Sequence, residues 1–255
     1  MANELSTADR LGDGVQNAPE TDCFLMIGQS NMAGRGDFGV VEPILDKNLF
    51  MLRNGRWQQM SEPINPDRGI FSGKYRSGVG LAASFALDYH RATGRKVGLI
   101  PCADGGTRLD QWAPGEVLYE NAVNCTRLAM KNAVLKGILW HQGEADVIHP
   151  EMVATYRDRF LTMIHTLYAD LGVAPVPVMI GELGAYLTRR GGGYLLTPEL
   201  NAVFAQIAAA DEYGMCGVVS AEGLECREDV LHFNSPSLRV FGDRYFDVYR
   251  RIAKI

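Results

Sequence analysis

Long apolar stretches are missing from this 255-residue sequence, in which no run approaches the roughly 20 residues that a membrane-spanning helix needs. Residues 1–22 are polar and lack the apolar segment of a signal peptide. We therefore expect a soluble, cytoplasmic protein, or a secreted one if a leader has been trimmed. Its first 22 residues are expected to form a disordered or extended tail.

Concentrated positive charge is missing as well. The formal net charge is −5, and no cluster of Lys and Arg is available to neutralise phosphates. This argues against a nucleic-acid partner. A neutral or modestly polar small molecule fits the composition better.

Paired cysteine spacings are absent, and an odd number of cysteines cannot be fully paired within one chain. The five cysteines are expected to be free, mostly buried thiols in a reducing compartment: Cys23, Cys102, Cys125, Cys216 and Cys226. No metal is expected, because His141 and Glu144 lack a third ligand nearby. No cofactor is expected either. The glycine run at 191–193 lacks a Gly-Lys-Ser/Thr ending and is more typical of a flexible turn than of a phosphate-binding loop.

Short apolar strands alternate with helical patterns along the chain, without a repeat or a second domain boundary. The pattern predicts right-handed parallel crossovers, and therefore a three-layer α/β/α sandwich around a central, mainly parallel five-stranded sheet. The single domain is expected to cover residues 23–255. Asn54-Gly55 favours a hairpin turn, interpreted as an insertion beside the main sheet. The five strands are expected at residues 24–27, 97–100, 135–140, 176–180 and 215–220.

Ser30 stands where the first apolar strand stops. Residues 24–27 are continuously apolar, which is typical of a strand covered on both faces, and Gly28 and Gly34 allow a tight turn around the serine. A serine at a strand-to-helix turn suits a nucleophile. The same position also suits a helix N-cap, for which serine is a favoured residue.

The carboxylate of Asp229 comes three residues before His232, just ahead of the last helical pattern. A nucleophilic serine needs a base, and an imidazole base needs an acceptor that fixes its tautomer. With both side chains on one turn, Asp229 and His232 can supply these two roles for Ser30.

These residues, with the Gly-Gln-Ser-Asn-Met, Gly-Gly-Thr, His-Gln-Gly-Glu and Asp-Val-Leu-His-Phe-Asn blocks, resemble the SGNH hydrolase superfamily. The sequence is most similar to carbohydrate O-acetylesterases, the branch of sialate O-acetylesterase and the acetylxylan esterases of carbohydrate esterase family six. The resemblance covers about residues 24–253 in matching order. It implies a flavodoxin-like fold and a catalytic triad of Ser30, His232 and Asp229.

The resemblance also implies an oxyanion hole. Its donors would be the N–H of Ser30, the N–H of Gly105 or Gly106, and the side-chain amide of Gln142, which matches the asparagine of other superfamily members. Placing Gln142 after a strand would let its amide point at the pocket. The two glycines could instead serve only a tight turn.

Five further residues are expected to support the site or line the substrate rim. Trp112 is expected either to wall the acyl pocket or to pin a loop. Relatives often carry a serine after the glutamate of the His-Gln-Gly-Glu block, where this chain has Ala145, and that departure could change a supporting hydrogen bond. The five residues are Gln29, Asn31, Glu144, Arg76 and Trp112.

The sequence thus predicts a serine ester hydrolase. The substrate implied by the resemblance is an acetylated carbohydrate, cleaved through an acyl-enzyme intermediate. A general short-chain esterase or thioesterase is an alternative, because one triad can serve many acyl donors. A catalytically silent carbohydrate-binding protein is another.

Overall fold

The computed structural model describes residues 21–65 and 77–255. The strands are β1 Thr21–Gly28, β2 Leu49–Arg53, β3 Arg56–Gln59, β4 Lys96–Pro101, β5 Val134–His141, β6 Val178–Gly181 and β7 Cys216–Val219. The helices are α2 Ser30–Ala33, α3 Ala82–Thr93, α4 Val117–Ala129, α5 Pro150–Leu171, α6 Thr197–Ala210 and α7 Ser235–Ala253. Three 3-10 helices accompany them: η2 Leu109–Trp112, η3 Ala185–Arg190 and η4 Gly192–Leu196.

The strands form one seven-stranded sheet in the order β3-β2-β4-β1-β5-β6-β7. Every neighbouring pair is parallel except β2 and β3. The predicted α/β fold with a mainly parallel central sheet is confirmed. The hairpin was expected beside the sheet, but β2 pairs in parallel with β4. It therefore extends the predicted five strands to seven.

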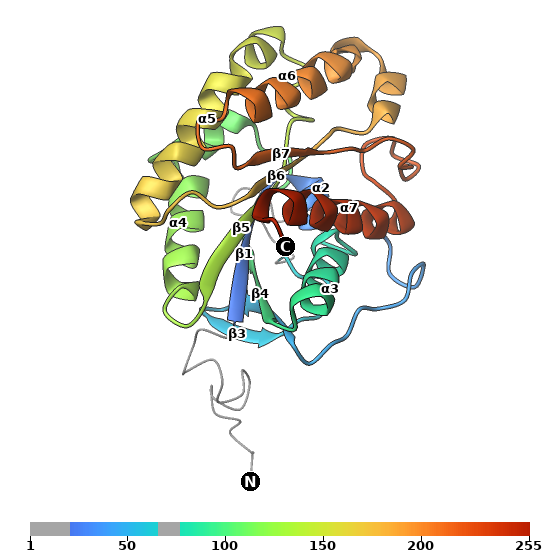
Figure 1. Ribbon diagram of the computed structural model, residues 1–255. Helices are drawn as coiled ribbons and strands as arrows, with labels where there is room; N and C mark the ends of the chain where they lie inside the picture. Colours follow the sequence, from blue (N-terminus) through green and yellow to red (C-terminus); the bar gives the residue numbers. More distant parts are fainter. Residues whose placement is uncertain (1–20, 66–76) are drawn as a thin grey trace.

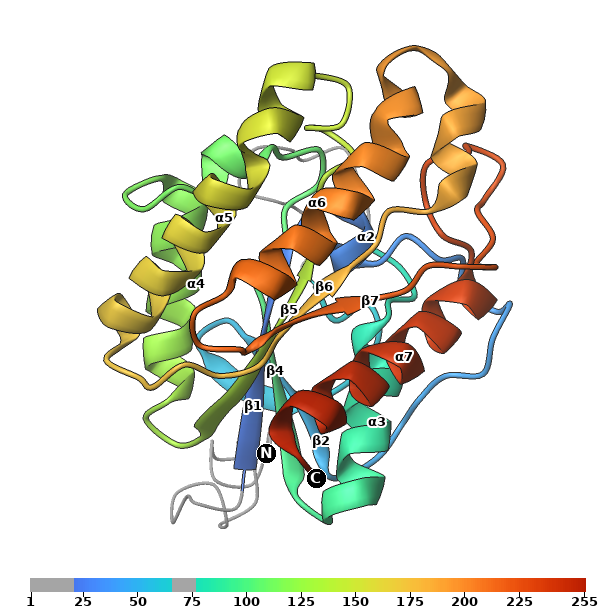
Figure 2. The same cartoon turned by 45° about the horizontal axis from the view of Figure 1, so that its top comes forward.

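Helices cover both faces of this sheet (Figures 1 and 2). Helices α3 and α7 pack together over one face, whereas α4, α5 and α6 lie over the other. The direction of the strand order reverses at β1. Strands β2, β3 and β4 lie on one side of β1, and β5, β6 and β7 follow on the other side. Open α/β sheets bind their ligands at such a reversal point, beyond the carboxyl ends of the strands.

Strand β1 starts at Thr21, three residues before the predicted strand 24–27. Thr21 and Asp22 were assigned to the tail, but both are buried within the sheet. The carboxylate of Asp22 accepts a hydrogen bond from Tyr89 Oη at 2.7 Å and from Arg95 Nε at 3.1 Å. These partners offset the cost of burying its charge. The remainder of the expected tail, residues 1–20, lies outside the described residues.

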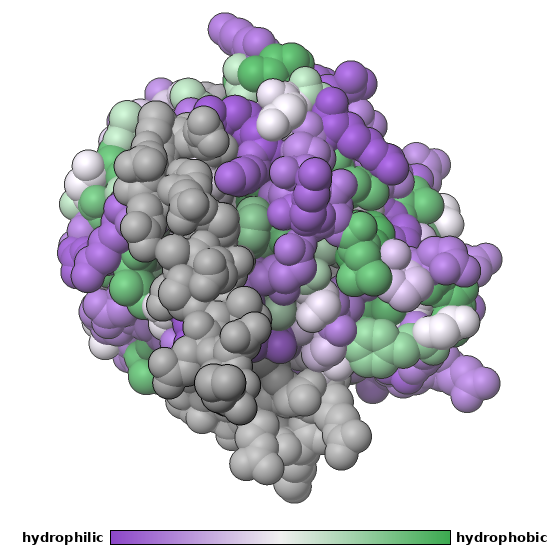
Figure 3. All heavy atoms as spheres, turned by 90° about the horizontal axis from the view of Figure 1, so that it is seen from below, coloured by the Kyte–Doolittle hydropathy of each residue, from purple (hydrophilic) through white to green (hydrophobic). Residues whose placement is uncertain are grey.

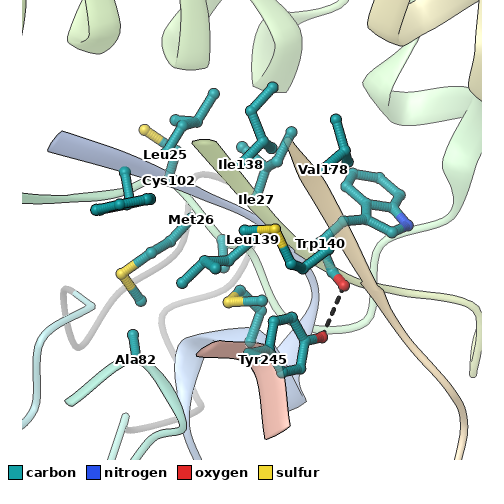
Figure 4. Close-up of a cluster of buried hydrophobic side chains, with 14 of the residues drawn as sticks. Leu25, Met26, Ile27, Ala82, Cys102, Ile138, Leu139, Trp140, Val178 and Tyr245 are labelled. Atoms are coloured by element: carbon teal, nitrogen blue, oxygen red, sulfur yellow. Dashed lines mark hydrogen bonds between the residues drawn. The ribbon is translucent and has the colours of Figure 1, made fainter. Parts of the chain in front are cut away.

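The core is built around β1 and β5, whose side chains are buried on both sides of the sheet (Figure 4). Phe24 meets Phe85, Tyr89 and Tyr249 edge to face, with ring centroids 4.8–5.3 Å apart. Each such pair adds about 0.5–1.5 kcal/mol beyond area burial. Helix α7 is tied to β5 where Tyr245 Oη donates to the carbonyl of Trp140 at 2.8 Å.

Among the described helices, none is long and apolar enough to cross a membrane. The face drawn in Figure 3 intersperses hydrophilic and hydrophobic residues.

Candidate active site

The side chains of Ser30, His232 and Asp229 form a continuous hydrogen-bonded chain. Nε2 of His232 lies 3.0 Å from Ser30 Oγ, and Nδ1 lies 2.7 Å from Asp229 Oδ2. A carboxylate only accepts, so Nδ1 carries the proton and Nε2 presents its lone pair to the serine hydroxyl. This is the arrangement that a general base needs in order to take a proton from a nucleophile.

The serine stands at the junction of β1 and α2. Gly28 turns the chain there with φ +126°, and an added Cβ would lie 2.1 Å from the carbonyl oxygen of His141. A side chain at this position would thus collide with β5. Ser30 is the first residue of α2, so its N–H has no intrahelical acceptor and faces outwards at the helix start.

The turn from Asp229 to His232 is tight. The other carboxylate oxygen of Asp229, Oδ1, accepts the N–H groups of Leu231 and His232, each at 2.9 Å. Val230 takes φ +54°, an unfavourable value for a β-branched residue that costs on the order of 1–3 kcal/mol. The turn brings the carboxylate back under the imidazole.

These hydrogen bonds govern the ionisation of Asp229. Burial by itself would raise the pKa of this carboxyl, but hydrogen bonds from the His232 N–H, the imidazole and the Leu231 N–H outweigh it. The pKa of Asp229 therefore lies below its ordinary value. The carboxylate stays ionised at neutral pH and can stabilise an imidazolium.

Asn31 connects the two ends of the chain. Its Oδ1 accepts the N–H of Phe233 at 3.1 Å, and its Nδ2 donates to the carbonyl of Leu231 at 3.3 Å. Nδ2 also donates to Glu144 Oε1. The sequence left the partner of Glu144 open, and the structure identifies it as Asn31.

Glu144 is 2% exposed, and its Oε2 has no hydrogen-bond partner within the described part of the chain. His141 lies behind it, with Nδ1 3.6 Å from Glu144 Oε1 and Nε2 3.2 Å from the carbonyl of Glu182. Burial lowers the pKa of His141. A carbonyl only accepts, so the neutral ring carries its proton on Nε2.

A pocket of about 160 Å³ opens above Ser30 and His232. Such a volume suits a short acyl group rather than a long chain. The remaining residues that line it are Gln29, Arg35, Gly105, Gly106, Glu144, Ala145, Tyr194 and Leu231.

The two glycines differ in their relation to the serine. A Cβ on Gly105 would lie 2.7 Å from Arg35 Nη2 and 3.7 Å from Ser30 Cβ. A Cβ on Gly106 would meet no atom within 4 Å, but Gly106 has φ +77°. Neither glycine N–H has an acceptor among the residues described, and both line the pocket. Gly105 is thus the one packed against the nucleophile.

Gln142 does not reach the pocket, contrary to the expectation that its amide would point there. The residue is fully buried, and its Nε2 donates to Asp146 Oδ2 at 2.6 Å and to the carbonyl of Thr107 at 2.9 Å. Its Oε1 accepts from Tyr156 Oη at 2.7 Å. Asp146, four residues further along the chain, accepts a hydrogen bond from the amide and holds it inside the protein.

Trp112 is also absent from the pocket wall. It is 1% exposed, donates from Nε1 to Thr107 Oγ1 at 3.1 Å and packs edge to face on Trp140. Of its two expected roles, the structure supports pinning the loop after β4. Arg76 lies outside the described residues. No group of three His, Cys, Asp or Glu side chains within residues 21–65 and 77–255 is arranged to hold a metal ion.

Arg35 and Tyr194 line the pocket without having been singled out from the sequence. Arg35 lies between Gly34 and Gly36, directly after the Ser30 turn, and this position in the sequence could have indicated that it lines the pocket. Tyr194 belongs to η4, so the glycine run expected as a flexible turn folds into 3-10 helices instead. The guanidinium of Arg190 lies 5.0 Å from the Tyr194 ring centroid and donates to the carbonyl of Asp229 at 2.6 Å.

Comparison with known proteins gives consistent matches. Residues 20–251 match the family described as carbohydrate esterase, sialic acid-specific acetylesterase. A probable carbohydrate esterase of Arabidopsis thaliana is 31% identical over 235 residues, which cover 85% of each protein. The crystal structure of this plant protein superposes with a TM-score of 0.80 at 25% identity, covering 91% of this chain and 99% of the other.

Two more distant structures share the fold. A carbohydrate acetylesterase from Xanthomonas citri gives a TM-score of 0.65 at 20% identity, covering 91% of this chain and 56% of the other. An aryl esterase from M. smegmatis gives 0.55 at 15% identity, covering 91% and 99%. These two structures show the shared SGNH-type fold, and the family match over nearly the whole chain identifies the protein as a carboxylic-ester hydrolase. The chain belongs to the carbohydrate esterase family described as sialic acid-specific acetylesterase.

Proposed function

We propose that the protein hydrolyses acetyl esters of carbohydrates through an acyl-enzyme intermediate on Ser30. The observation that carries the proposal is the hydrogen-bonded chain from Ser30 Oγ through His232 to Asp229, at 3.0 and 2.7 Å, on the floor of a small pocket. Membership of an esterase family favours this over a silent carbohydrate-binding protein.

In the first half of the reaction, Nε2 of His232 takes the proton of Ser30 as Oγ attacks the acetyl carbonyl carbon. The carbonyl π electrons move to its oxygen, which becomes the oxyanion. The N–H groups of Ser30 and Gly105 stabilise that charge, and Asp229 stabilises the imidazolium. Collapse of the tetrahedral intermediate breaks the bond to the sugar oxygen, which takes the proton from His232.

In the second half, a water molecule gives a proton to His232 and attacks the acetyl-serine. The same two N–H groups stabilise the second oxyanion. The bond to Ser30 Oγ breaks, Oγ recovers the proton from His232, and acetic acid leaves and gives its proton to solvent as acetate forms. The site is thereby restored without any change in oxidation state.

A carbohydrate leaving group agrees with the mouth of the pocket. Tyr194 offers an aromatic ring in the pocket lining, against which the C–H face of a sugar can pack. A general short-chain esterase would not need this ring, so the leaving group distinguishes the two functions.

The test is acetate release from p-nitrophenyl acetate and from a panel of acetylated sugars, including acetylated sialic acids and xylo-oligosaccharides. Ser30→Ala and His232→Ala should each lower kcat by about 10³-fold or more. His149→Ala is the matched control, since His149 is on the surface at the start of α5. Activity surviving in Ser30→Ala would refute the mechanism. A preference for p-nitrophenyl acetate over every sugar would favour the general esterase.

A further inference from the structure

Gln29 directly precedes the nucleophile, and its side chain has one defined orientation. Its Oε1 accepts the backbone N–H of Ala145 at 3.3 Å and of Gly143 at 3.4 Å, together with Nε2 of Gln142 at 3.2 Å. Backbone N–H groups can only donate, so the atom facing them must be the oxygen. The amide nitrogen of Gln29 is therefore on the opposite side, away from the loop that follows β5.

Gln29 lines the pocket with Ser30 and His232, and no described residue accepts a hydrogen bond from that nitrogen. The nitrogen is not one of the buried side-chain atoms that lack a partner, so it is accessible to a ligand. A donor that is held in place beside a nucleophile and lacks a protein acceptor points to an acceptor on the ligand.

Gln142 cannot supply this donor, because its two amide hydrogens are shared among three protein acceptors, Asp146 Oδ2, the carbonyl of Thr107 and Gln29 Oε1. The contact with Gln29 Oε1 helps to orient the Gln29 side chain. These contacts hold the amide of Gln142 inside the protein, whereas the amide nitrogen of Gln29 faces the pocket.

We propose that Nε2 of Gln29 is the side-chain donor to the oxyanion, alongside the N–H groups of Ser30 and Gly105. This assignment rests on the serine-esterase function proposed above. A donor fixed before the reaction stabilises developing charge without reorganising, and loss of one such donor commonly lowers turnover by about 10² to 10³-fold.

Gln29→Glu tests the assignment, because it keeps an oxygen for the donors that Gln29 Oε1 binds and replaces the pocket-facing NH₂ by a charged oxygen that cannot donate. We expect kcat on p-nitrophenyl acetate to fall by about 10² to 10³-fold. Affinity for a boronic acid, which forms a tetrahedral adduct on a nucleophilic serine, should fall by a similar factor, whereas KM and the unfolding midpoint should change little. Gln58→Glu on β3 is the matched control and should behave as the native protein.

The outcomes separate the two proposals. Hydrolysis that is absent in the native protein, or that survives in Ser30→Ala, refutes the esterase mechanism itself. Serine-dependent hydrolysis in which Gln29→Glu retains native turnover and boronate affinity overturns the role of Gln29 alone. A fall in turnover with unchanged boronate affinity also overturns it, because the oxyanion contact must act on the tetrahedral adduct.

Discussion

Asn31 hydrogen-bonds to the peptide groups on both sides of His232, accepting the N–H of Phe233 at 3.1 Å and donating to the carbonyl of Leu231 at 3.3 Å. The residue after the nucleophile thereby sets the position of the base, although Asn31 and Leu231 are 200 positions apart in the chain. Nucleophile and base are thus held by one short segment after β1.

Replacing Asn31 with Ala should therefore lower kcat by about 10- to 100-fold while Ser30 and His232 remain present, since a small displacement of a catalytic group is costly. KM should change less than kcat. The check is steady-state kinetics. Asn31→Asp should not restore kcat, because it retains the acceptor for the Phe233 N–H but places a second buried carboxylate against that of Glu144. Native kcat in Asn31→Ala would show that the loop holds His232 unaided.

Gln142→Ala should affect stability, because it removes hydrogen bonds to Asp146, Thr107 and Tyr156 inside the protein. Leaving buried polar groups unsatisfied costs about 1–3 kcal/mol each. Urea unfolding should show a lower midpoint with an unchanged slope. A variant of native stability that loses about 10² to 10³-fold in turnover would instead restore Gln142 as an oxyanion donor.

Gly105→Ala should mainly lower activity, whereas Gly106→Ala should mainly lower stability. The methyl group at Gly105 would meet Arg35 Nη2 at 2.7 Å beside Ser30, so kcat should fall. The methyl group at Gly106 would enter open space, but the positive φ there should cost about 1 kcal/mol of stability. Parallel kinetics and thermal unfolding test this contrast. Equal losses of activity in both variants would contradict the choice of Gly105.

Asp229→Asn should lower kcat by about 10² to 10⁴-fold, because Asn can present the wrong group to His232 Nδ1. The pKa of Asp229 lies below its ordinary value of 3.8 in the folded protein. Its stabilising effect is therefore complete above that ordinary value and is lost only as pH falls through the lowered one. The activity deficit should stay constant from about pH 5 to pH 8. A deficit that shrinks within this range would contradict it.

Asp243→Asn on α7 should stabilise the protein at neutral pH. Burial, followed by the charge of Asp88, raises the pKa of Asp243 to about 6. A raised carboxyl pKa means that stability is lost as pH rises from the unfolded value through about 6, and the neutral amide avoids that loss. The side chain remains partly exposed to solvent, so the gain in Tm at pH 8 should be only about 1–3 °C. Thermal unfolding at pH 8 and pH 4 checks it, because the gain should vanish at pH 4.

The position of the nucleophile could be predicted because neighbouring residues in the sequence determine it. An apolar run that ends at Gly28 predicts a strand followed by a turn, and the spacing of Asp229 and His232 places a carboxylate within reach of an imidazole on one turn. Burial on both faces of β1 made the parallel arrangement the natural expectation.

Tertiary contacts decided what the local pattern could not. Gln29 and Gln142 both follow strands that end beside the pocket, so periodicity places them equally well there. Only the packing of β1 against β5 brings the N–H groups of Gly143 and Ala145 to one amide, and the carboxylate of Asp146 to the other. The pairing of β2 with β4 was equally non-local. The sequence by itself determined which chemical groups meet at the strand ends. The hydrogen bonds of the folded chain decided which atom of each group faces the substrate, because a buried polar atom needs a partner and the surrounding residues supply it.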